Sequence, residues 1–162
     1  MKRLILLLVL CIATVMSFSQ TYKLYRTQNY HNQLKLNTAT GKVEQVQDDG
    51  QSWVINTDIL PSGDIPGRFV LYETENIWTF ILLDSFNGRL WQCQFSVNGE
   101  EYMMTIPINI FPLTSTLNHK SVFTIQPMVS MFQFYLINDD TGEMWQFQWS
   151  TKGDDYRWIK KM

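Results

Sequence analysis

The chain has 162 residues, of which 45% are hydrophobic, 14% are aromatic and only 17% are charged, and its formal net charge is −2. That length suits one domain with a core of its own. Because the chain is mildly acidic and carries no cluster of Lys and Arg, it lacks the positive surface with which proteins bind phosphates. Nucleic acid is therefore excluded as an expected partner.

The first residues have the pattern of a secretory signal peptide. Lys2 and Arg3 precede an apolar run from Leu4 to Met16, and small residues follow. This pattern predicts cleavage near Ser19-Gln20 and an exported protein, periplasmic or extracellular, that is soluble after cleavage. The run is shorter than the about 20 residues that a spanning helix needs, and no later segment could span, so no integral membrane span is expected.

The chain has two cysteines, and only one lies beyond the signal peptide. Cys11 follows Leu10, whereas a lipid-modified cysteine normally follows a small residue, so a lipid anchor is not the expected outcome. Cys93 then has no partner for an internal disulfide, and stability must come from packing. We interpret Cys93 as a buried thiol, and leave a reactive thiol or an intermolecular disulfide open.

One hairpin unit occurs three times, about 50 residues apart, and such internal repeats decide the architecture. Each copy begins its loop with Asn or Asp and ends it with Gly, the residues that a hairpin turn with positive φ requires. Strand-forming aromatic and aliphatic residues flank each loop. The three copies are residues 34–47, 81–94 and 135–148.

A further strand precedes each hairpin and another follows it, which gives four strands a unit and about twelve in all. The expected preceding strands are residues 22–27, 68–74 and 121–126, and the expected following strands are 52–56, 102–106 and 156–159. We therefore predict an all-β fold of three tandem four-stranded antiparallel units. Residues 1–19 are assigned to the signal peptide, and residues 20–162 to one domain with repeats at about 20–60, 65–110 and 118–162.

The strand after each loop alternates between apolar and polar residues. Trp91, Cys93 and Phe95 share one face, and Gln92 and Gln94 share the other. This alternation predicts one face in the core and one against water or a polar groove.

The strand before each loop is apolar on both faces in the second and third copies, which predicts a buried central strand. The first copy is more polar, with Gln33, Lys35 and Glu44 at apolar positions, as in a capping repeat.

The second hairpin, with Asp84, Asn87-Gly88 and Arg89-Leu90-Trp91, resembles a blade of the quinoprotein-type β-propellers. The resemblance covers about a dozen residues a unit, and no quinone-binding or calcium-binding residue transfers with it. Known propellers usually close with four to eight blades. Three units therefore form either a β-trefoil-like closure or a small propeller-like array, which a second chain could complete.

Residues with catalytic or metal-binding chemistry form no recognised motif. His31 and His119 lie at unrelated places, so no metal site and no cofactor are expected. Acidic pairs occur at Asp48-Asp49, Glu100-Glu101 and Asp154-Asp155. Paired acids can hydrolyse glycosides across a cleft, but neighbouring acids in a turn usually point into water. The chain is therefore not expected to be an enzyme, and a hydrolase with a weak signature is the third hypothesis.

Every copy carries a Gln-x-Gln pair, and Trp residues lie nearby. An amide both donates and accepts hydrogen bonds, so it can match a sugar hydroxyl or a peptide group without charge. The alternative is that these amides form a polar strand face or a ladder between units. The candidate ligand-binding residues are Gln92, Gln94, Gln146, Gln148, Trp53, Trp78, Trp149 and Trp158.

The leading hypothesis is a non-catalytic exported binding module that recognises a protein or a glycan. A repeat scaffold rich in Trp, Tyr and Gln, without a catalytic grouping, motivates it. The alternative is a structural or assembly subunit that associates with itself through β edges as a homo-oligomer.

Overall fold

The computed structural model describes residues 20–57, 59, 65–114, 120 and 122–162. The predicted signal peptide, Cys11 and His119 lie outside the described residues. Within the described part of the chain, no helix is long and apolar enough to cross a membrane.

The described residues form twelve strands in three four-stranded antiparallel sheets, and each sheet follows the order of the chain. The predicted all-β fold of three tandem units is confirmed. The first sheet contains β1 (Tyr22–Arg26), β2 (Asn32–Asn37), β3 (Val43–Gln47) and β4 (Ser52–Val54); the second contains β5 (Phe69–Glu73), β6 (Thr79–Asp84), β7 (Arg89–Gln94) and β8 (Met104–Pro107); the third contains β9 (Phe123–Pro127), β10 (Gln133–Asn138), β11 (Met144–Gln148) and β12 (Trp158–Lys161). The short 3₁₀ turns η1 (Glu100–Tyr102) and η2 (Asp154–Tyr156) precede β8 and β12.

The hairpin loops form as the Asn and Gly residues predict. In the first repeat, Asn37 Oδ1 accepts hydrogen bonds from the backbone N–H of Ala39 and Thr40, at 2.9 and 3.2 Å. Gly41 then takes a φ of +79°, which L side chains rarely adopt. Asn138 repeats the arrangement in the third repeat, so the same local chemistry builds both turns.

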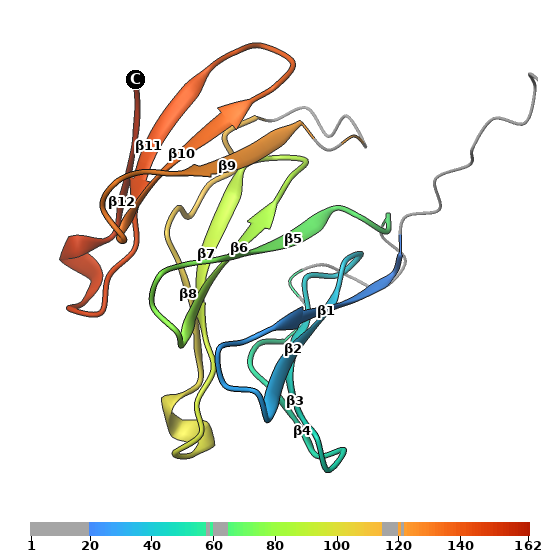
Figure 1. Cartoon of the computed structure of the whole chain (residues 1–162). Helices are drawn as coiled ribbons and strands as arrows, with labels where there is room; N and C mark the ends of the chain where they lie inside the picture. Colours follow the sequence, from blue (N-terminus) through green and yellow to red (C-terminus); the bar gives the residue numbers. More distant parts are fainter. Residues whose placement is uncertain (1–19, 58, 60–64, 115–119, 121) are drawn as a thin grey trace, which may run out of the picture.

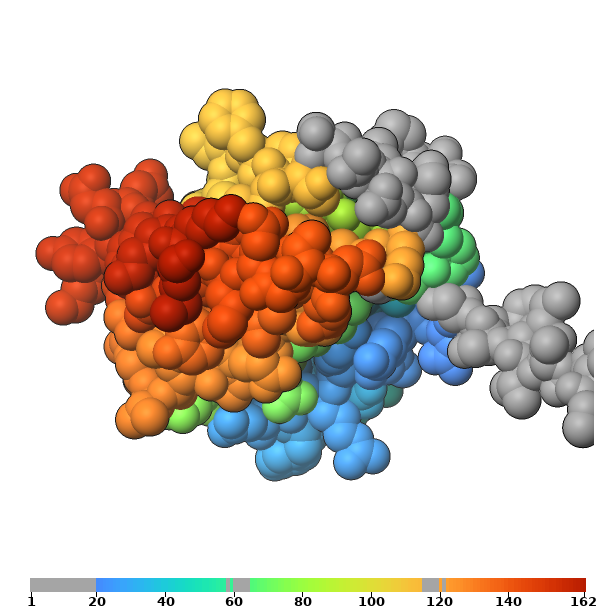
Figure 2. All heavy atoms as spheres, turned by 90° about the horizontal axis from the view of Figure 1, so that it is seen from above, coloured from blue at the N-terminus to red at the C-terminus, as the bar shows by residue number. Residues whose placement is uncertain are grey.

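The three sheets stack as successive layers, with the second sheet in the middle (Figure 1). Viewed from above, the β9–β12 layer lies over the other repeats (Figure 2). We call the face of each sheet that looks toward the following repeat its front face, and the opposite face its back face. Each seam between two sheets holds a separate apolar cluster, so the described residues form two cores rather than one.

The middle sheet is buried on both faces. All six residues of β6 are buried, with Phe80 and Leu82 in one core and Ile81 and Leu83 in the other. In β10 only alternate residues are buried, because no further sheet of the described chain covers its front face. The expectation of a strand buried on both faces therefore holds for the second repeat and not for the third.

The first sheet ends the array on the other side. Its back face carries Lys35 and Glu44, whose side chains form an ion pair at 2.5 Å. Partial burial raises the pKa of the Glu44 carboxyl, but hydrogen bonds and charge from Lys35 and Lys42 outweigh burial and hold the pKa below its ordinary value. A charged outer face agrees with the predicted capping role.

The described strands do not close into a barrel. Each repeat keeps its own sheet, and neighbouring sheets meet face to face. The β-trefoil-like closure is therefore not formed, and the open array is the arrangement observed.

The burial of the two tryptophans at equivalent places gives a stability prediction. Trp91 and Trp145 are 5% and 7% exposed, so Trp91→Ala and Trp145→Ala should each lower the free energy of unfolding by about 3 to 5 kcal/mol. Glu44→Ala, at the same place in the first sheet, should cost at most about 1 kcal/mol because its ion pairs are partly exposed. Urea unfolding measures all three, and equal losses would contradict the assigned strand faces.

Candidate functional site

A glutamine on β3 joins the first sheet to the second. The Gln45 side chain is 1% exposed; its Nε2 donates to Asn32 Oδ1 at 2.7 Å, and its Oε1 accepts from the Ser96 backbone N–H at 3.3 Å. Since β3 and β7 occupy the same place in their repeats, the next seam should contain the same contact.

Gln92 on β7 makes that contact at the second seam. It is 1% exposed, and its Oε1 accepts from the Ser150 backbone N–H at 3.3 Å. The Arg157 guanidinium also lies 3.4 Å from that oxygen and donates to the Ser150 carbonyl at 3.0 Å. The first glutamine of each Gln-x-Gln pair is thus a bridge between sheets in the first two repeats.

The first seam opens into a hollow at this end of the sheets. A cavity of about 270 Å³ lies between β3, β4 and the segment that leads from β7 to η1. A second hollow of about 400 Å³ adjoins it and shares Gln47 and Val97 with it. The first is lined by Gln45, Gln47, Trp53, Ser96, Val97, Gly99, Glu100 and Met103, and the second by Asn29, His31, Asn32, Gln47, Asp48, Asp49 and Val97. We call the two together the seam cleft.

One substitution between repeats explains why the first seam holds a hollow here. Met103 follows η1, and Arg157 follows η2 at the equivalent place. The Arg157 side chain is 7% exposed and occupies the second seam, where it contacts Gln92 and Ser150. Met103 instead packs against the first core and lines the cleft without a polar group.

The walls of the seam cleft combine amides, carboxylates and one indole. Trp53 is half-buried on β4, and Glu100 is exposed on η1. His31 Nδ1 lies 3.1 Å from Asp48 Oδ2 at the outer end. Within the described part of the chain, no hydrogen bond to the Gln47 side chain is recorded. Neutral polar groups with a flat apolar surface beside them suit a ligand rich in hydroxyl groups.

The predicted site residues do not form one group. Trp53 lies in the seam cleft, Gln92 is buried in the second seam, and Gln94 Nε2 donates to the Tyr102 carbonyl at 3.2 Å. Trp149 is fully buried, and its Nε1 donates a hydrogen bond to the Met131 carbonyl. Trp78 packs on Phe95 with ring centroids 5.3 Å apart. Both indole rings are therefore part of the packing of the cores.

The remaining predicted residues share the front face of the third sheet. Gln146 Nε2 donates to Gln133 Oε1 at 3.2 Å, and Gln133 Nε2 donates to Gln148 Oε1 at 2.8 Å. Gln148 pairs across the strands with Trp158, whose ring lies 5.3 Å from the Lys160 ammonium. This row of amides is a ladder within one sheet.

The other candidate groups lie apart from one another. Asp48, Asp49 and Glu100 line the seam cleft, whereas Asp154 pairs with Arg157 beside the second seam. Among the described residues, no three His, Cys, Asp or Glu side chains gather as a metal site would require.

Cys93 is buried, as predicted. Burial raises the pKa of its thiol to about 12, and the hydrogen bond from Thr105 opposes that shift only in part.

Comparison of the chain with family models, curated proteins and solved structures gives no match.

The sequence predicted Trp53 as a site residue, but Gln45, Gln47 and the difference between the two seams were missed. Aligning the repeats on their glycines places Met103 beside Arg157, and that difference in size and charge was the available signal.

The buried bridge gives a second prediction. Gln92→Ala should lower the free energy of unfolding by about 1 to 3 kcal/mol, because it leaves the buried Ser150 N–H without its acceptor. Gln94→Ala, two residues along the same strand, should change it by no more than about 0.5 kcal/mol. Thermal or urea unfolding compares the pair, and a neutral Gln92→Ala would show that the bridge contributes nothing.

A third prediction concerns Cys93. At pH 8 the folded protein should resist a thiol reagent, and unfolding in urea should release one reactive thiol. In the unfolded chain the thiol ionises near its ordinary pKa of about 8.5, whereas the folded chain keeps its proton. Because the thiol ionises more easily in the unfolded chain, its ionisation favours unfolding at high pH. The free energy of unfolding is therefore unaffected by Cys93 below about pH 8.5 and falls as the pH rises from there toward 12. Rapid labelling of the folded protein would contradict the assignment.

Proposed function

We propose that the chain is a non-catalytic, exported binding module and that the seam cleft binds a glycan. The observation that carries the proposal is the hollow at the first seam, at the place that Arg157 fills in the second. The export pattern of the N-terminus supports a ligand met outside the cytoplasm.

The chemistry of the cleft suits a ligand rich in hydroxyl groups, such as a glycan. Gln47 can donate to and accept from a hydroxyl group, and the carboxylates of Asp49 and Glu100 accept from sugar hydroxyls. The Trp53 ring offers the flat apolar surface on which a pyranose stacks. Small-molecule sites commonly combine such an apolar wall with a few polar groups in 300 to 1,000 Å³, roughly the size of this cleft.

The scaffold of this proposal is a short propeller-like array. We infer that the repeats are related in form to quinoprotein-type blades, as the hairpin with Asp84 and Trp91 suggests, but use the seam between two blades and no cofactor. The resemblance supplies only the architecture, and the ligand chemistry rests on the residues of the cleft.

The fourth prediction tests the cleft with defined probes. Residues 20–162, which contain all twelve strands, are applied to a glycan array, and the best oligosaccharide is titrated by calorimetry. Gln47→Ala and Trp53→Ala should each weaken binding at least about tenfold, the factor that corresponds to about 1.4 kcal/mol. Gln47→Ala should change the melting temperature little, and circular dichroism shows whether Trp53→Ala, which truncates a half-buried ring, keeps the fold.

Two matched variants serve as controls. Gln94→Ala removes the equivalent amide from the second repeat, and Trp158→Ala removes an indole from the third sheet; neither residue lines the cleft. Both should bind as the wild type does. Binding that falls equally in the controls would place the ligand elsewhere, and no binding to any glycan would reject the proposal.

A further inference from the structure

The front face of the third sheet repeats the four apolar positions that build both seams. Strand register and the backbone bonds at the ends of β3, β7 and β11 identify the equivalent positions. In the first two sheets all eight side chains are at most 8% exposed. They are Leu34, Leu36, Val43 and Ile55 in the first sheet, Ile81, Leu83, Leu90 and Ile108 in the second, and Tyr135, Ile137, Met144 and Met162 in the third.

The bridging glutamine is also present on this face. Gln146 occupies the place of Gln45 and Gln92, opposite Tyr135 in the register. Its Nε2 donates to Gln133 Oε1, as Gln45 Nε2 donates to Asn32 Oδ1. In the first two seams the Oε1 atom accepts a backbone N–H from the next sheet, and for Gln146 no such donor is recorded among the described residues.

The hairpin glycines show the same relation. A Cβ placed on Gly41 would lie 3.0 Å from the Phe69 ring, and one on Gly88 would lie 3.1 Å from the Phe123 ring. Each ring comes from the following sheet. Within the described part of the chain, no atom lies within 4 Å of a Cβ placed on Gly142. The third hairpin therefore leaves open the space that an aromatic ring fills in the first two.

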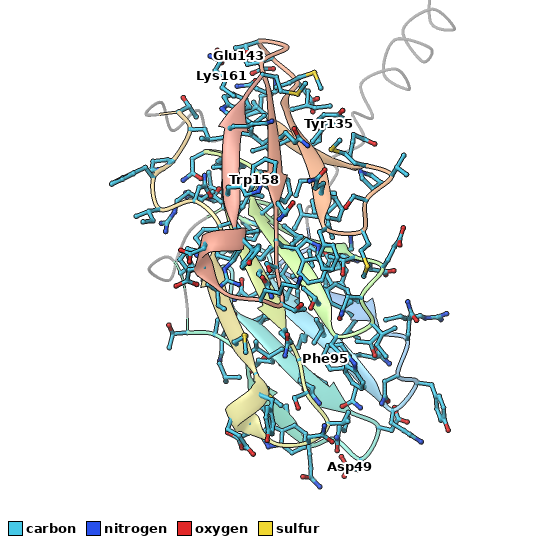
Figure 3. All side chains as sticks on the ribbon, turned by 90° about the vertical axis from the view of Figure 1, so that its left-hand side faces the viewer. Asp49, Phe95, Tyr135, Glu143, Trp158 and Lys161 are labelled. Atoms are coloured by element: carbon cyan, nitrogen blue, oxygen red, sulfur yellow. The ribbon has the colours of Figure 1, made fainter. Side chains whose placement is uncertain are left out.

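This face lies on the outside of the array. Figure 3 places Tyr135 and Trp158 on the terminal sheet, with the ion pair of Glu143 and Lys161 at its edge and Asp49 at the far end of the molecule. Met162 is 68% exposed. Tyr, Trp and Met are enriched in protein interfaces, so the composition of the face suits a protein partner.

A second copy could offer either of its two outer faces. The back face of the first sheet has Gln33, Lys35 and Glu44 where the second sheet has Phe80, Leu82 and Trp91. In head-to-tail stacking, the front face of one copy would pack on the back face of the first sheet of the next. This would remove the Lys35–Glu44 ion pair from water beneath Ile137, and an apolar surface makes no polar contact that offsets the desolvation penalty. Tyr22 and Leu24 are exposed on that back face at the places of Phe69 and Leu71, but the charged pair beside them argues against the first sheet as the occupant.

We propose that the occupant is the front face of a second copy, so that two β9–β12 sheets pack against each other about a two-fold axis. The apolar positions of one copy then meet those of the other. Gln146 and Gln148 carry amides, which donate and accept and so can pair with amides across the axis. An interface of this kind uses one patch on both copies, as in most homodimers. It uses a surface separate from the seam cleft and does not depend on the glycan proposal.

The size of the face sets the expected affinity. Four strands about 4.8 Å apart, each about five residues long at about 3.4 Å per residue, give a face of roughly 20 by 17 Å. Two such faces cover about 700 Å² together, below the about 1,200 Å² of stable interfaces, so we expect a weak, transient dimer with a dissociation constant in the micromolar range.

The fifth prediction is tested by sedimentation velocity of residues 20–162 from about 1 to 200 μM, a range that spans micromolar dissociation constants. The wild type should shift from monomer to dimer. Ile137→Arg should shift the midpoint at least tenfold upward, because it places a charge among the four apolar positions of the face. Circular dichroism and the melting temperature show whether the variant folds, and Met144→Arg, on the neighbouring strand, replaces it if it does not.

The matched control is Leu24→Arg. Leu24 is 59% exposed on the back face of the first sheet, where Leu71 and Ile125 stand in the other sheets. Front-to-front packing predicts that Leu24→Arg dimerises normally, whereas head-to-tail packing predicts that it does not. A wild type that stays monomeric at 200 μM, a dimer that folded Ile137→Arg leaves intact, or a dimer that Leu24→Arg breaks would each overturn the proposal.

Discussion

A β-sheet with two apolar faces is stable in water only when another layer covers each of them, and this constraint governs the whole chain. The middle sheet satisfies it fully, since every residue of β6 is buried. Among the described strands, each outer sheet has one covered face, and the uncovered faces of the two sheets differ in composition. The first sheet carries the ion-paired Lys35 and Glu44 on its back face, whereas the third keeps Ile137 and Met144 on its front face. The two ends of the array are therefore chemically unlike, and only one resembles a seam.

Two polar contacts buried in the stack, an ion pair and an amide bridge, also fix its geometry. Arg68 Nε and Nη2 donate to the two carboxylate oxygens of Asp84 at 2.9 and 2.8 Å, and the guanidinium lies over the rings of Phe69 and Phe86. A buried ion pair offers little net stability over apolar packing, but removing one partner leaves an expensive uncompensated charge. The pair thus ties the start of β5 to the end of β6, and the Gln92 bridge ties that sheet to the next in the same manner.

Alternation along single strands was enough to predict the faces of β7, because Trp91, Cys93 and Phe95 differ so clearly from Gln92 and Gln94. The glycine spacing was enough to predict three four-stranded units. The pattern could not tell that the polar face of the second repeat packs against the third, since alternation separates two faces without saying what each one meets. For that reason Gln92 proved to be a bridge, and no sheet formed by the described residues covers the front face of β10. Contacts between repeats depend on how whole sheets stack, which no local window of sequence contains.

The seam cleft follows from a departure from repeat symmetry rather than from the repeat itself. At the second seam the Arg157 guanidinium forms an ion pair with Asp154. It also donates hydrogen bonds to the Ser150 carbonyl and the Gln92 side chain, so this space is filled. Met103 at the first seam supplies packing but no donors, and the neighbouring walls remain open. A hollow in a stack of sheets normally costs packing energy, unless solvent or a ligand occupies it. Here the hollow has polar walls and opens to solvent, so water or a hydroxyl-rich ligand can satisfy it without disturbing the core beneath.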